Sequence, residues 1–396
     1  MRILFISQTT DIGGATIALK NIVTEVSKRY VIGILMPSRS GWLVDELSIL
    51  PCKLFFSDYE MMIYPTHCIC KYGRTNPIGY LKFIKAVYNK IVKQKKAKKD
   101  LICILHVFKP DIVHCNCSPL SFSADVCHKL HIPHVWHIRE YSDLGYGHHL
   151  MPSKGCFFRK MTAKGNYCIA ITKGIFQHFK LREGIDKVIY DGVFDEGLCP
   201  EEFKLNLMGN YFLSVGRIEP AKGTLELIES FARFHRNHSN VRLLLVGGFS
   251  NLLYLNSFKE VCKKYNIENV VFFCGVRDDV FTLMQHAIAL IVASPNEGFG
   301  FSATEAMLNS CIVIGRNTAG IKEQFDKGLQ ITGSEIGLRY NTQEELIMQM
   351  NKAICRNYDT DMKQRAYSVV IKNYTIQVHV KSLMDYYLNI LKNCRN

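Results

Sequence analysis

Two glutamates stand eight positions apart around a glycine-rich turn, in the stretch SPNEGFGFSATEAML at residues 294–308. Glu297 precedes the turn, and Glu305 lies inside the helix that the pattern predicts after it. The positive end of a helix dipole alone favours acidic residues in the first turns. The sharper interpretation is that both carboxylates hold one ligand, because a carboxylate can accept two hydrogen bonds from adjacent hydroxyl groups.

Two cationic residues and the glycine-rich turn itself also belong to this candidate site. The strand pattern FLSVG ends immediately before Arg217, and Lys222 precedes the next predicted helix. A forked guanidinium and a point-charge ammonium suit a diphosphate, above all while negative charge builds on a leaving group. Gly298, Phe299 and Gly300 form the turn, where backbone can approach a ligand and free N–H groups can meet phosphate oxygens. The plainer alternative is two surface cations near a turn.

The elements that position these residues form two similar halves. Short apolar strands are predicted in the first half at residues 3–7, 31–37, 111–116, 134–138 and 167–172, and in the second half at residues 211–217, 241–248, 270–276, 288–295 and 311–316. Helical patterns separate them. We therefore predict an α/β protein with two Rossmann-like, doubly wound domains facing a central cleft. Ligands of such sheets lie beyond the carboxyl ends of the strands.

The expected boundaries follow from where the pattern restarts. We predict a first domain at residues 1–192, a joining segment near 192–208 and a second domain at 209–375. An amphipathic helix is expected at 376–396, where it can cross back to the first domain.

Composition narrows the class of protein. The chain has 396 residues, of which 48% are hydrophobic and 21% charged, as in a globular protein. No apolar run is long enough to cross a bilayer. Fifteen cysteines occur without a CxxC pair, which fits buried thiols in a reducing compartment and predicts a cytoplasmic protein. Residues 1–200 carry a net charge of +11 out of a total of +14, so the first half is expected to meet an anionic partner.

Three motifs carry a resemblance to a known family. GRIEPAKG at residues 216–223, EGFGFSATE at 297–305 and GGA at 13–15 together resemble the retaining family-four glycosyltransferases of the GT-B fold, the glycosyl transferases group 1. The resemblance runs in order along essentially the whole chain. It implies a nucleotide-diphosphate-sugar donor of the UDP or GDP type on the second domain, a glycan or lipid-linked acceptor mainly on the first, and no metal or other cofactor.

The resemblance also assigns roles in the second domain. Arg217 and Lys222 would hold the diphosphate, and Glu305 would bind the ribose. Glu297 would contact the donor sugar near the reacting carbon. Arg277, in the segment GVRDDV, falls where the backbone of the family contacts the base.

In the first domain the resemblance is less direct. His137, at the carboxyl end of the strand pattern in VWHIRE, falls where the family has a histidine that faces the sugar. On position alone, His137 reads as an interior histidine. Gly13 and Gly14 would shape the loop that faces the donor phosphates and the acceptor. Arg139 and Glu140 are either an ion pair or acceptor contacts.

The sequence offers no protein nucleophile, so the family implies front-face displacement, in which the leaving phosphate takes the proton of the acceptor and the anomeric configuration is kept. A dinucleotide-dependent oxidoreductase is disfavoured because DIGGATIALK lacks the G-x-G-x-x-G spacing. A sugar-nucleotide epimerase or a phosphorylase on the same fold remains an alternative. So does a non-catalytic nucleotide-sugar binding protein.

Two further patterns need an interpretation. Residues 82–99 contain eight lysines in an amphipathic helical pattern, which either docks on an anionic membrane surface, such as the inner face of the membrane, or is a solvated face. No recognition module for nucleic acid accompanies them. His128, His131, His134 and His137 resemble metal ligands, but Pro133 interrupts the run, and residues three apart on a strand face opposite sides. We predict no metal site.

Overall fold

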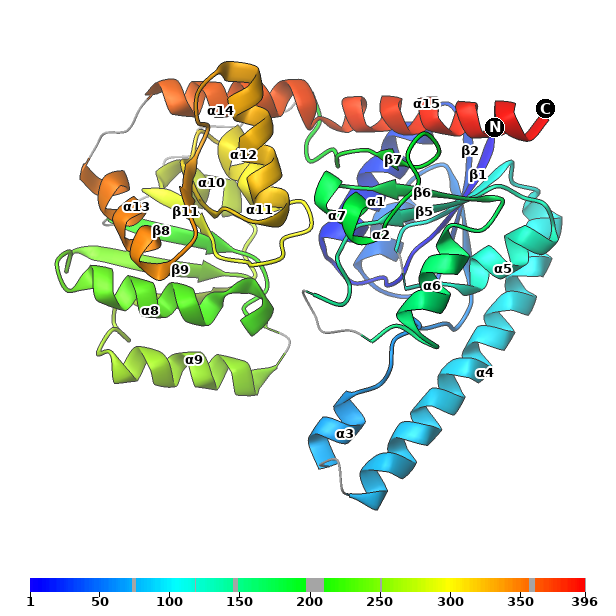
Figure 1. The fold of residues 1–396 in the computed structure, drawn as a ribbon, viewed down its shortest axis with the longest axis horizontal. Helices are drawn as coiled ribbons and strands as arrows, with labels where there is room; N and C mark the ends of the chain where they lie inside the picture. The colour runs from blue at the N-terminus through cyan, green and yellow to red at the C-terminus, as the bar shows by residue number, and fades with distance from the viewer. Residues whose placement is uncertain are drawn as a thin grey trace. The chain divides into compact units, whose positions relative to one another are not determined.

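Two units, each built around one parallel sheet, make up the protein in a computed structural model (Figure 1). The structure describes residues 1–72, 76–117, 119–144, 149–196, 210–249, 251–355 and 360–395. The first unit comprises Met1–Gly192 together with His379–Asn396, and the second comprises Val193–Val378. Most of the joining segment expected near 192–208 lies outside the described residues.

The first sheet has the strand order β3-β2-β1-β4-β5-β6-β7, and its strands pair in parallel. The order reverses between β1 and β4, which is the switch point where ligands of doubly wound sheets bind. Its strands are β1 (Arg2–Ile6), β2 (Val31–Met36), β3 (Cys52–Phe56), β4 (Ile112–Cys115), β5 (His134–Ile138), β6 (Asn166–Ala170) and β7 (Lys187–Val188).

Helices pack around this sheet. They are α1 (Gly14–Val26), α2 (Trp42–Ser48), α3 (His67–Tyr72), α4 (Pro77–Phe108), α5 (Phe122–Lys129), α6 (Lys154–Met161), α7 (Lys173–His178) and α15 (Ile376–Arg395). From His379 onward α15 belongs to the first unit, where Leu383, Tyr387 and Ile390 are buried. The last helix of the chain therefore completes the core of the first unit.

The second sheet has the order β10-β9-β8-β11-β12-β13, again parallel, with its switch point between β8 and β11. Its strands are β8 (Asn210–Val215), β9 (Val241–Val246), β10 (Val271–Gly275), β11 (Ala289–Val292), β12 (Val313–Arg316) and β13 (Leu338–Tyr340). The helical segments are η1 (Pro220–Lys222), α8 (Thr224–His235), α9 (Leu252–Lys264), α10 (Val280–His286), α11 (Phe301–Leu308), α12 (Ala319–Thr332), α13 (Gln343–Cys355) and α14 (Thr360–Asn373).

The ten predicted strands are all present, and three others were not anticipated. These are β3, β7 and β13. Strand β7 has two residues and β13 has three, which is too short for an apolar pattern to register. Strand β3 lies at the edge of its sheet and is only half-buried, so its sequence CKLFF lacks the uninterrupted apolar run of a central strand.

Candidate functional site

The switch point of the second unit brings two predicted site residues together. Strands β8 and β11 are neighbours in the sheet, and the loops that follow them leave the same edge. Lys222 ends η1 in the first loop, and Glu297 lies in the second. The Nζ atom of Lys222 donates a hydrogen bond of 2.8 Å to Oε2 of Glu297. Both side chains keep part of their surface exposed, so the pair is accessible to a ligand.

Close backbone contact between the two loops fixes this pair. Gly223 follows Lys222 with a φ of 72°, a left-handed conformation that glycine adopts without strain. A Cβ atom on Gly223 would lie 2.3 Å from the carbonyl oxygen of Ala293, which follows β11. Only glycine therefore allows the loop after β8 to approach the loop after β11. Helix α8 begins here, and its N-cap residue Gly223 makes no side-chain capping hydrogen bond to the first N–H groups of the helix.

The two predicted arginines lie at different strand ends. Arg217 is the second residue after β8, about half of its side chain is exposed, and its Nε lies 3.5 Å from Oε1 of the buried Glu219. Arg277 follows β10, which β9 separates from β8. Its guanidinium makes two hydrogen bonds with Asp279, of 2.5 and 2.7 Å. Arg217 therefore lies in the same loop as Lys222, whereas Arg277 lies after the edge strand β10 and is paired with Asp279.

The glycine-rich turn is held by the start of α12. Gly300 has a φ of 98° and caps α11, where no side chain occupies the capping position. The amide of Gln324 donates hydrogen bonds to the carbonyl oxygens of Phe299, at 2.7 Å, and of Gly300, at 3.3 Å. The N–H of Gly320 donates to the carbonyl oxygen of Glu297 at 3.0 Å. These bonds fix the backbone on which Glu297 stands.

Two members of the turn can meet a ligand only through their backbone. The Phe299 ring is buried and packs against the rings of Phe301 and Tyr374. Gly298 has no side chain, and its carbonyl oxygen would lie 2.7 Å from a Cβ atom placed on Gly320. A glycine at 320 is therefore required for α12 to begin against the turn.

The carboxyl group of Glu305 has no polar partner within the part of the chain that the structure describes. It lies in α11, with a small part of its surface exposed. Among the residues that the structure describes, none forms a hydrogen bond or an ion pair with its carboxyl group. Burial raises the pKa of Glu305 to about 7. A ligand that offers hydroxyl donors would stabilise the charged form of this group.

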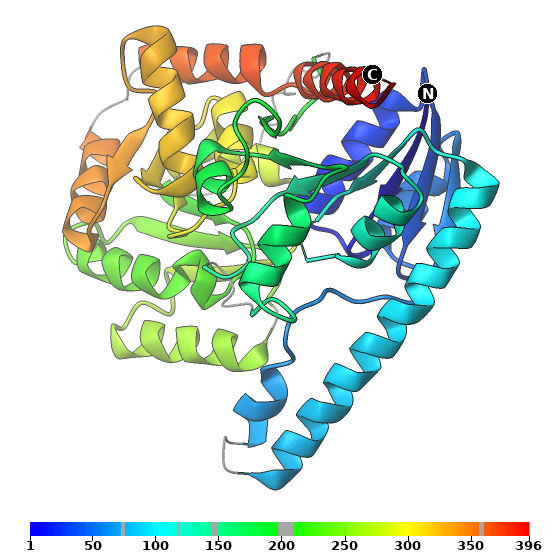
Figure 2. The same cartoon turned by 45° about the vertical axis from the view of Figure 1, so that its right-hand side comes forward.

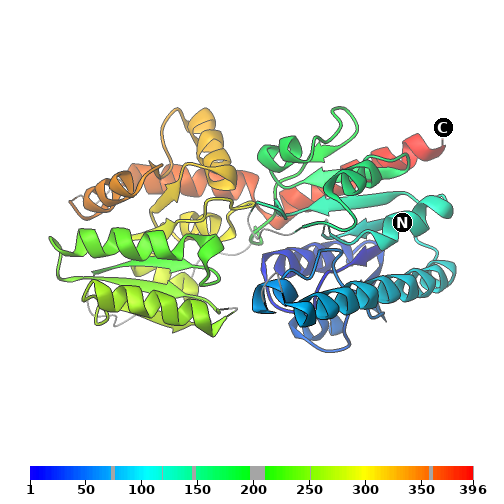
Figure 3. The ribbon, with the colours of Figure 1, turned by 60° about the horizontal axis from the view of Figure 1, so that its bottom comes forward.

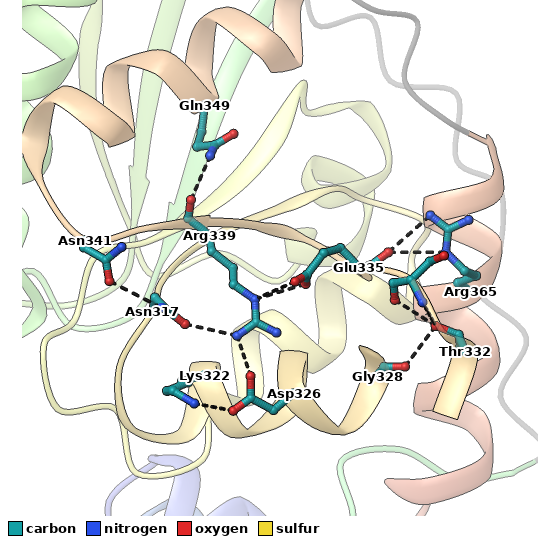
Figure 4. Close-up of polar contacts among 11 residues, drawn as sticks. Asn317, Lys322, Asp326, Gly328, Thr332, Glu335, Arg339, Asn341, Gln349 and Arg365 are labelled. Carbon is teal, nitrogen blue, oxygen red and sulfur yellow. Dashed lines mark hydrogen bonds and ion pairs between the residues drawn. The ribbon is translucent and has the colours of Figure 1, made fainter. Parts of the chain in front are cut away.

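A polar network that the sequence did not predict anchors α12 (Figure 4). Arg339 on β13 donates hydrogen bonds to Asp326 of α12, at 2.6 Å, and to Asn317, two residues before α12, at 3.0 Å. Its Nε also lies 3.0 Å from Oε2 of Glu335. Because α12 holds the glycine-rich turn, Arg339 supports the site without reaching it. An isolated arginine in a three-residue strand gives no sequence signal for this role.

In the first unit, the switch point between β1 and β4 contains the predicted glycines. Gly13 caps α1 and Gly14 begins it. Gly13 is extended, with a φ of 179°, and a Cβ atom added to it would meet nothing within 4 Å. Neither backbone strain nor packing therefore requires glycine at position 13. Asn116, directly after β4, donates a hydrogen bond of 2.8 Å to the carbonyl oxygen of Ala15 and so ties this loop to the sheet.

His137 lies inside the first unit, with no exposed surface. Its Nδ1 lies 3.3 Å from Nε2 of His114 and 3.2 Å from Nη2 of Arg139, and its ring stacks on that of His379 in α15. Burial and the Arg139 charge hold the pKa of His137 well below its usual value, so the ring is neutral. This environment matches the interior-histidine alternative and presents no ring atom at the surface.

Arg139 is also buried, and its side chain has polar partners within the first unit. Its guanidinium forms an ion pair with Asp191 and donates a hydrogen bond of 2.9 Å to Oδ1 of Asn116. An acceptor could reach this buried side chain only after a rearrangement. Glu140, the next residue, is half-buried.

No group of histidine, cysteine, aspartate or glutamate within the described parts of the chain has a geometry that could hold a metal ion. The regularly spaced histidines have separate partners. His134 Nε2 lies 2.9 Å from Oγ of Ser123, and His128 Nδ1 lies 3.2 Å from the carbonyl oxygen of Lys164. Likewise, no helix within the described ranges combines the length and apolarity needed to cross a bilayer.

Two parallel-sheet Rossmann-like units in one chain, each with a strand order that reverses beside its first strand, define a GT-B fold. A solved structure with the same fold is that of HepE of Anabaena in complex with UDP. It has a TM-score of 0.74 and 20% identity, over 97% of this chain and 99% of that one.

Sequence comparison finds a family match. Residues 199–368, within the second part of the chain, match the model for the glycosyl transferases group 1. A trehalose synthase of Pyrococcus horikoshii is 27% identical over 201 residues, 49% of this chain and 46% of that protein. An uncharacterized glycosyltransferase of Methanocaldococcus jannaschii is 27% identical over 308 residues, 72% of this chain and 74% of that protein. The chain thus spans about half the length of the trehalose synthase it matches.

Proposed function

We propose that this protein is a retaining glycosyltransferase that moves a sugar from a nucleotide-diphosphate-sugar to an acceptor hydroxyl. The observation that carries the proposal is the pairing of Lys222 with Glu297 at the switch point, together with the largely buried Glu305 of α11, whose carboxyl group has no polar partner among the described residues. The group 1 family match and the UDP named with the HepE structure support a donor of the UDP or GDP type.

Each group in the second unit has a role in this proposal. Arg217 and Lys222 bind the diphosphate, and the first N–H groups of α8, which have no side-chain cap from Gly223, are available to add hydrogen bonds to it. Glu305 accepts hydrogen bonds from the two ribose hydroxyls, which compensate its burial. Glu297 contacts the sugar near the reacting carbon. It already holds Lys222 at 2.8 Å, so the cation and the sugar contact are positioned by one interaction.

The reaction needs no protein nucleophile. The bond between the anomeric carbon and the phosphate oxygen breaks, and the acceptor oxygen forms its bond on the same face of the sugar. The acceptor proton moves to the leaving phosphate, whose developing charge Arg217 and Lys222 stabilise. Gly13 leaves open space at the start of α1, where a donor phosphate or an acceptor can approach the backbone. The role of His137 stays a prediction, because its ring would first have to leave its buried position.

For the acceptor we propose a lipid-linked or polysaccharide glycan, reached on the cytoplasmic side of a membrane. The support is the excess positive charge of residues 1–200, which suits an anionic surface or substrate. The enzyme would then contribute to the synthesis of a surface polysaccharide or a glycolipid.

A thermal-shift panel tests donor binding. UDP, GDP, ADP and NAD are each added to the wild type and to the Arg217→Ala variant. A ligand present at one hundred times its dissociation constant adds about 2.7 kcal/mol of stability. Arg233→Ala is the matched control, because Arg233 is an exposed, ion-paired arginine on α8 of the same unit. We expect one nucleoside diphosphate to shift the wild type and the control but not Arg217→Ala.

Turnover separates an enzyme from a binding protein. With sugar nucleotides of the responding base, the release of nucleoside diphosphate is measured with and without glycan acceptors, and the product is analysed for its anomeric configuration. Retention supports the proposal. A shift with NAD alone, or release of the opposite anomer, contradicts it.

A further inference from the structure

Helix α4 is packed into its unit over only half of its length. It has 32 residues, from Pro77 to Phe108. The buried side chains Gln94, Ala97, Leu101 and Leu105 all lie in its carboxyl-terminal half, together with Phe108, and recur every three or four residues as on one helical face. Figures 2 and 3 show α4 as one long helix along the side of its own unit, with α3 beside its amino-terminal end.

The amino-terminal half exposes a row of large apolar side chains, which we call the apolar ridge. It consists of Leu81, Ile84, Tyr88 and Ile91, which are 67%, 61%, 65% and 41% exposed. Their spacing of three, four and three residues places them on one face of the helix. Contact between water and large apolar side chains is unfavourable, so a continuous exposed apolar surface of this kind indicates a contact site.

The other faces of this half already have partners in the unit. The ring of Phe83 stacks on that of Tyr64 at a centroid distance of 6.1 Å. Lys90 and Lys93 donate hydrogen bonds of 2.8 Å to the two carboxylate oxygens of Glu60. These two lysines therefore hold the helix to its own unit. The eight lysines of residues 82–99 are not one uniform surface.

Four other lysines continue and flank the apolar ridge. Lys85, Lys95, Lys96 and Lys99 are exposed and form no ion pair with a residue that the structure describes. At helical spacing, Lys95 and Lys99 follow Ile91 on the same face, while Lys85 and Lys96 lie beside it. The same face therefore changes from apolar side chains to cations along the helix, which is the composition of a helix that lies in an anionic lipid interface.

We propose that the apolar ridge inserts into the surface of an anionic lipid bilayer, with Lys85, Lys95, Lys96 and Lys99 on the lipid headgroups. This inference rests on the proposed function, because docking would bring the first unit to a lipid-linked acceptor. Insertion to the depth of an interfacial helix, about 5–10 Å, covers the ridge without any spanning segment. The charge of these lysines selects a lipid surface over a neutral apolar partner.

Vesicle sedimentation tests the apolar part of this surface. Binding to phosphatidylcholine vesicles is compared with binding to vesicles containing three parts in ten phosphatidylglycerol, for the full chain. We expect the wild type to bind the anionic vesicles. The exposed pair Ile84→Gln with Tyr88→Gln should lower partitioning at least tenfold. The matched control is Ile49→Gln with Val107→Gln, which are 83% and 77% exposed in the same unit, outside the ridge.

The charged part is tested by Lys95→Gln, Lys96→Gln and Lys99→Gln together. Each lysine near an anionic surface contributes about fivefold to partitioning, so the triple variant should lose about one hundredfold, and less at high salt. The control removes the same charge from exposed lysines of the second unit, with Lys259→Gln, Lys263→Gln and Lys372→Gln.

Four outcomes overturn the inference: no binding of the wild type to anionic vesicles, equal binding to neutral vesicles, equal losses in the controls, or a concentration-dependent dimer that only the ridge variants abolish. The nucleotide-induced thermal shift is measured on every variant. If that shift persists while vesicle binding is absent, only the docking inference fails. If vesicle binding persists but no nucleotide shifts the protein, the proposed function fails.

Discussion

Glu305→Gln should stabilise the second unit while it weakens donor binding. Burial raises the pKa of Glu305 from a reference value of 4.5 to about 7. At 1.36 kcal/mol for each pKa unit, the charged carboxylate costs the folded state up to about 3 kcal/mol. The figure is an upper limit because part of the residue is exposed. Glutamine has nearly the same shape and no charge, so it removes this cost.

The gain in the free energy of unfolding from Glu305→Gln should increase as the pH rises. Below pH 4.5 the carboxyl group is protonated in both the folded and the unfolded chain, so its charge costs nothing. As the pH rises from 4.5 through 7, the unfolded chain loses the proton first, and the wild type loses stability. The stability difference between Glu305→Gln and the wild type should therefore be small at pH 4.5, grow up to pH 7 and be constant at pH 8.

Urea unfolding at pH 5, 6, 7 and 8 measures this difference, and the chain contains an internal control. Both tryptophans, Trp42 and Trp136, lie in the first unit, so their fluorescence reports that unit, while circular dichroism reports both. The stabilisation should appear in the dichroism transition only. A variant that is no more stable at pH 8 than the wild type, or equally stabilised at pH 5 and pH 8, refutes a buried, unpartnered carboxylate.

Nucleotide affinity of the same variant tests the ligand side. Hydrogen bonds to a charged group contribute about 1.5–3 kcal/mol, so Glu305→Gln should weaken nucleoside diphosphate binding by about ten- to a hundredfold. Because the ribose hydroxyls prefer the charged carboxylate, wild-type affinity should fall as the pH drops below 7, by up to tenfold per pH unit, and the variant should lack this dependence. Calorimetric titration at several pH values measures both. An affinity that is unchanged by the substitution removes Glu305 from the donor site.

Four further substitutions test other parts of the structure. Glu297→Ala should lower turnover by at least a hundredfold with little change in nucleotide affinity, since we propose that Glu297 contacts the sugar; steady-state kinetics and calorimetry measure this, and an equal loss of both would place Glu297 on the nucleotide. Gly13→Ala should leave stability within about 0.5 kcal/mol but reduce turnover, because the new methyl group meets only open space that a ligand would enter. Urea unfolding measures the stability of this variant and initial rates measure its turnover. Unchanged rates would contradict a role of the Gly13 loop in ligand binding. Gly223→Ala should instead destabilise the second unit by at least about 1 kcal/mol, since its Cβ atom meets the Ala293 carbonyl and its φ is positive; a neutral effect in urea unfolding would mean that the loop relaxes. Arg339→Met should destabilise the second unit by about 1 kcal/mol, because it removes the hydrogen bonds of Arg339 to two exposed carboxylates and to Asn317, while Asp326 stays paired with Lys322. Arg365→Met, which removes two hydrogen bonds to a single carbonyl oxygen, is the milder comparison.

The central strands and the Lys222–Glu297 pair could be predicted from local sequence. A fully buried strand such as β11, with the sequence ALIV, is a continuous apolar run, and parallel topology places the residues that follow β8 and β11 at one edge. The prediction that Lys222 and Glu297 converge needs nothing else, and the structure brings them to 2.8 Å. The lysine-rich helix was predicted as well, but α4 extends beyond residues 82–99 at both ends, because Asn76 caps its start and its buried face continues to Phe108.

Other features depend on residues far away in sequence. Whether His137 faces a ligand or the interior is decided by α15, which brings His379 and Tyr387 against the β4–β5 part of the sheet. Nothing near residue 137 contains that information. The anchoring of α12 similarly depends on Arg339, which no motif distinguishes from other arginines on short strands.

The return of α15 to the first unit has a consequence for the order of synthesis. The second unit is continuous in the chain, so it can fold as soon as residue 378 has left the ribosome. The synthesis of the first unit begins earlier, but the unit is completed later, because Leu383, Tyr387 and Ile390 are made after the second unit and are buried in the first. Until Tyr387 has been made, its hydroxyl group is not available for the buried hydrogen bond with His114. The amino-terminal unit therefore stays incompletely packed while about two hundred residues of the second unit are synthesised.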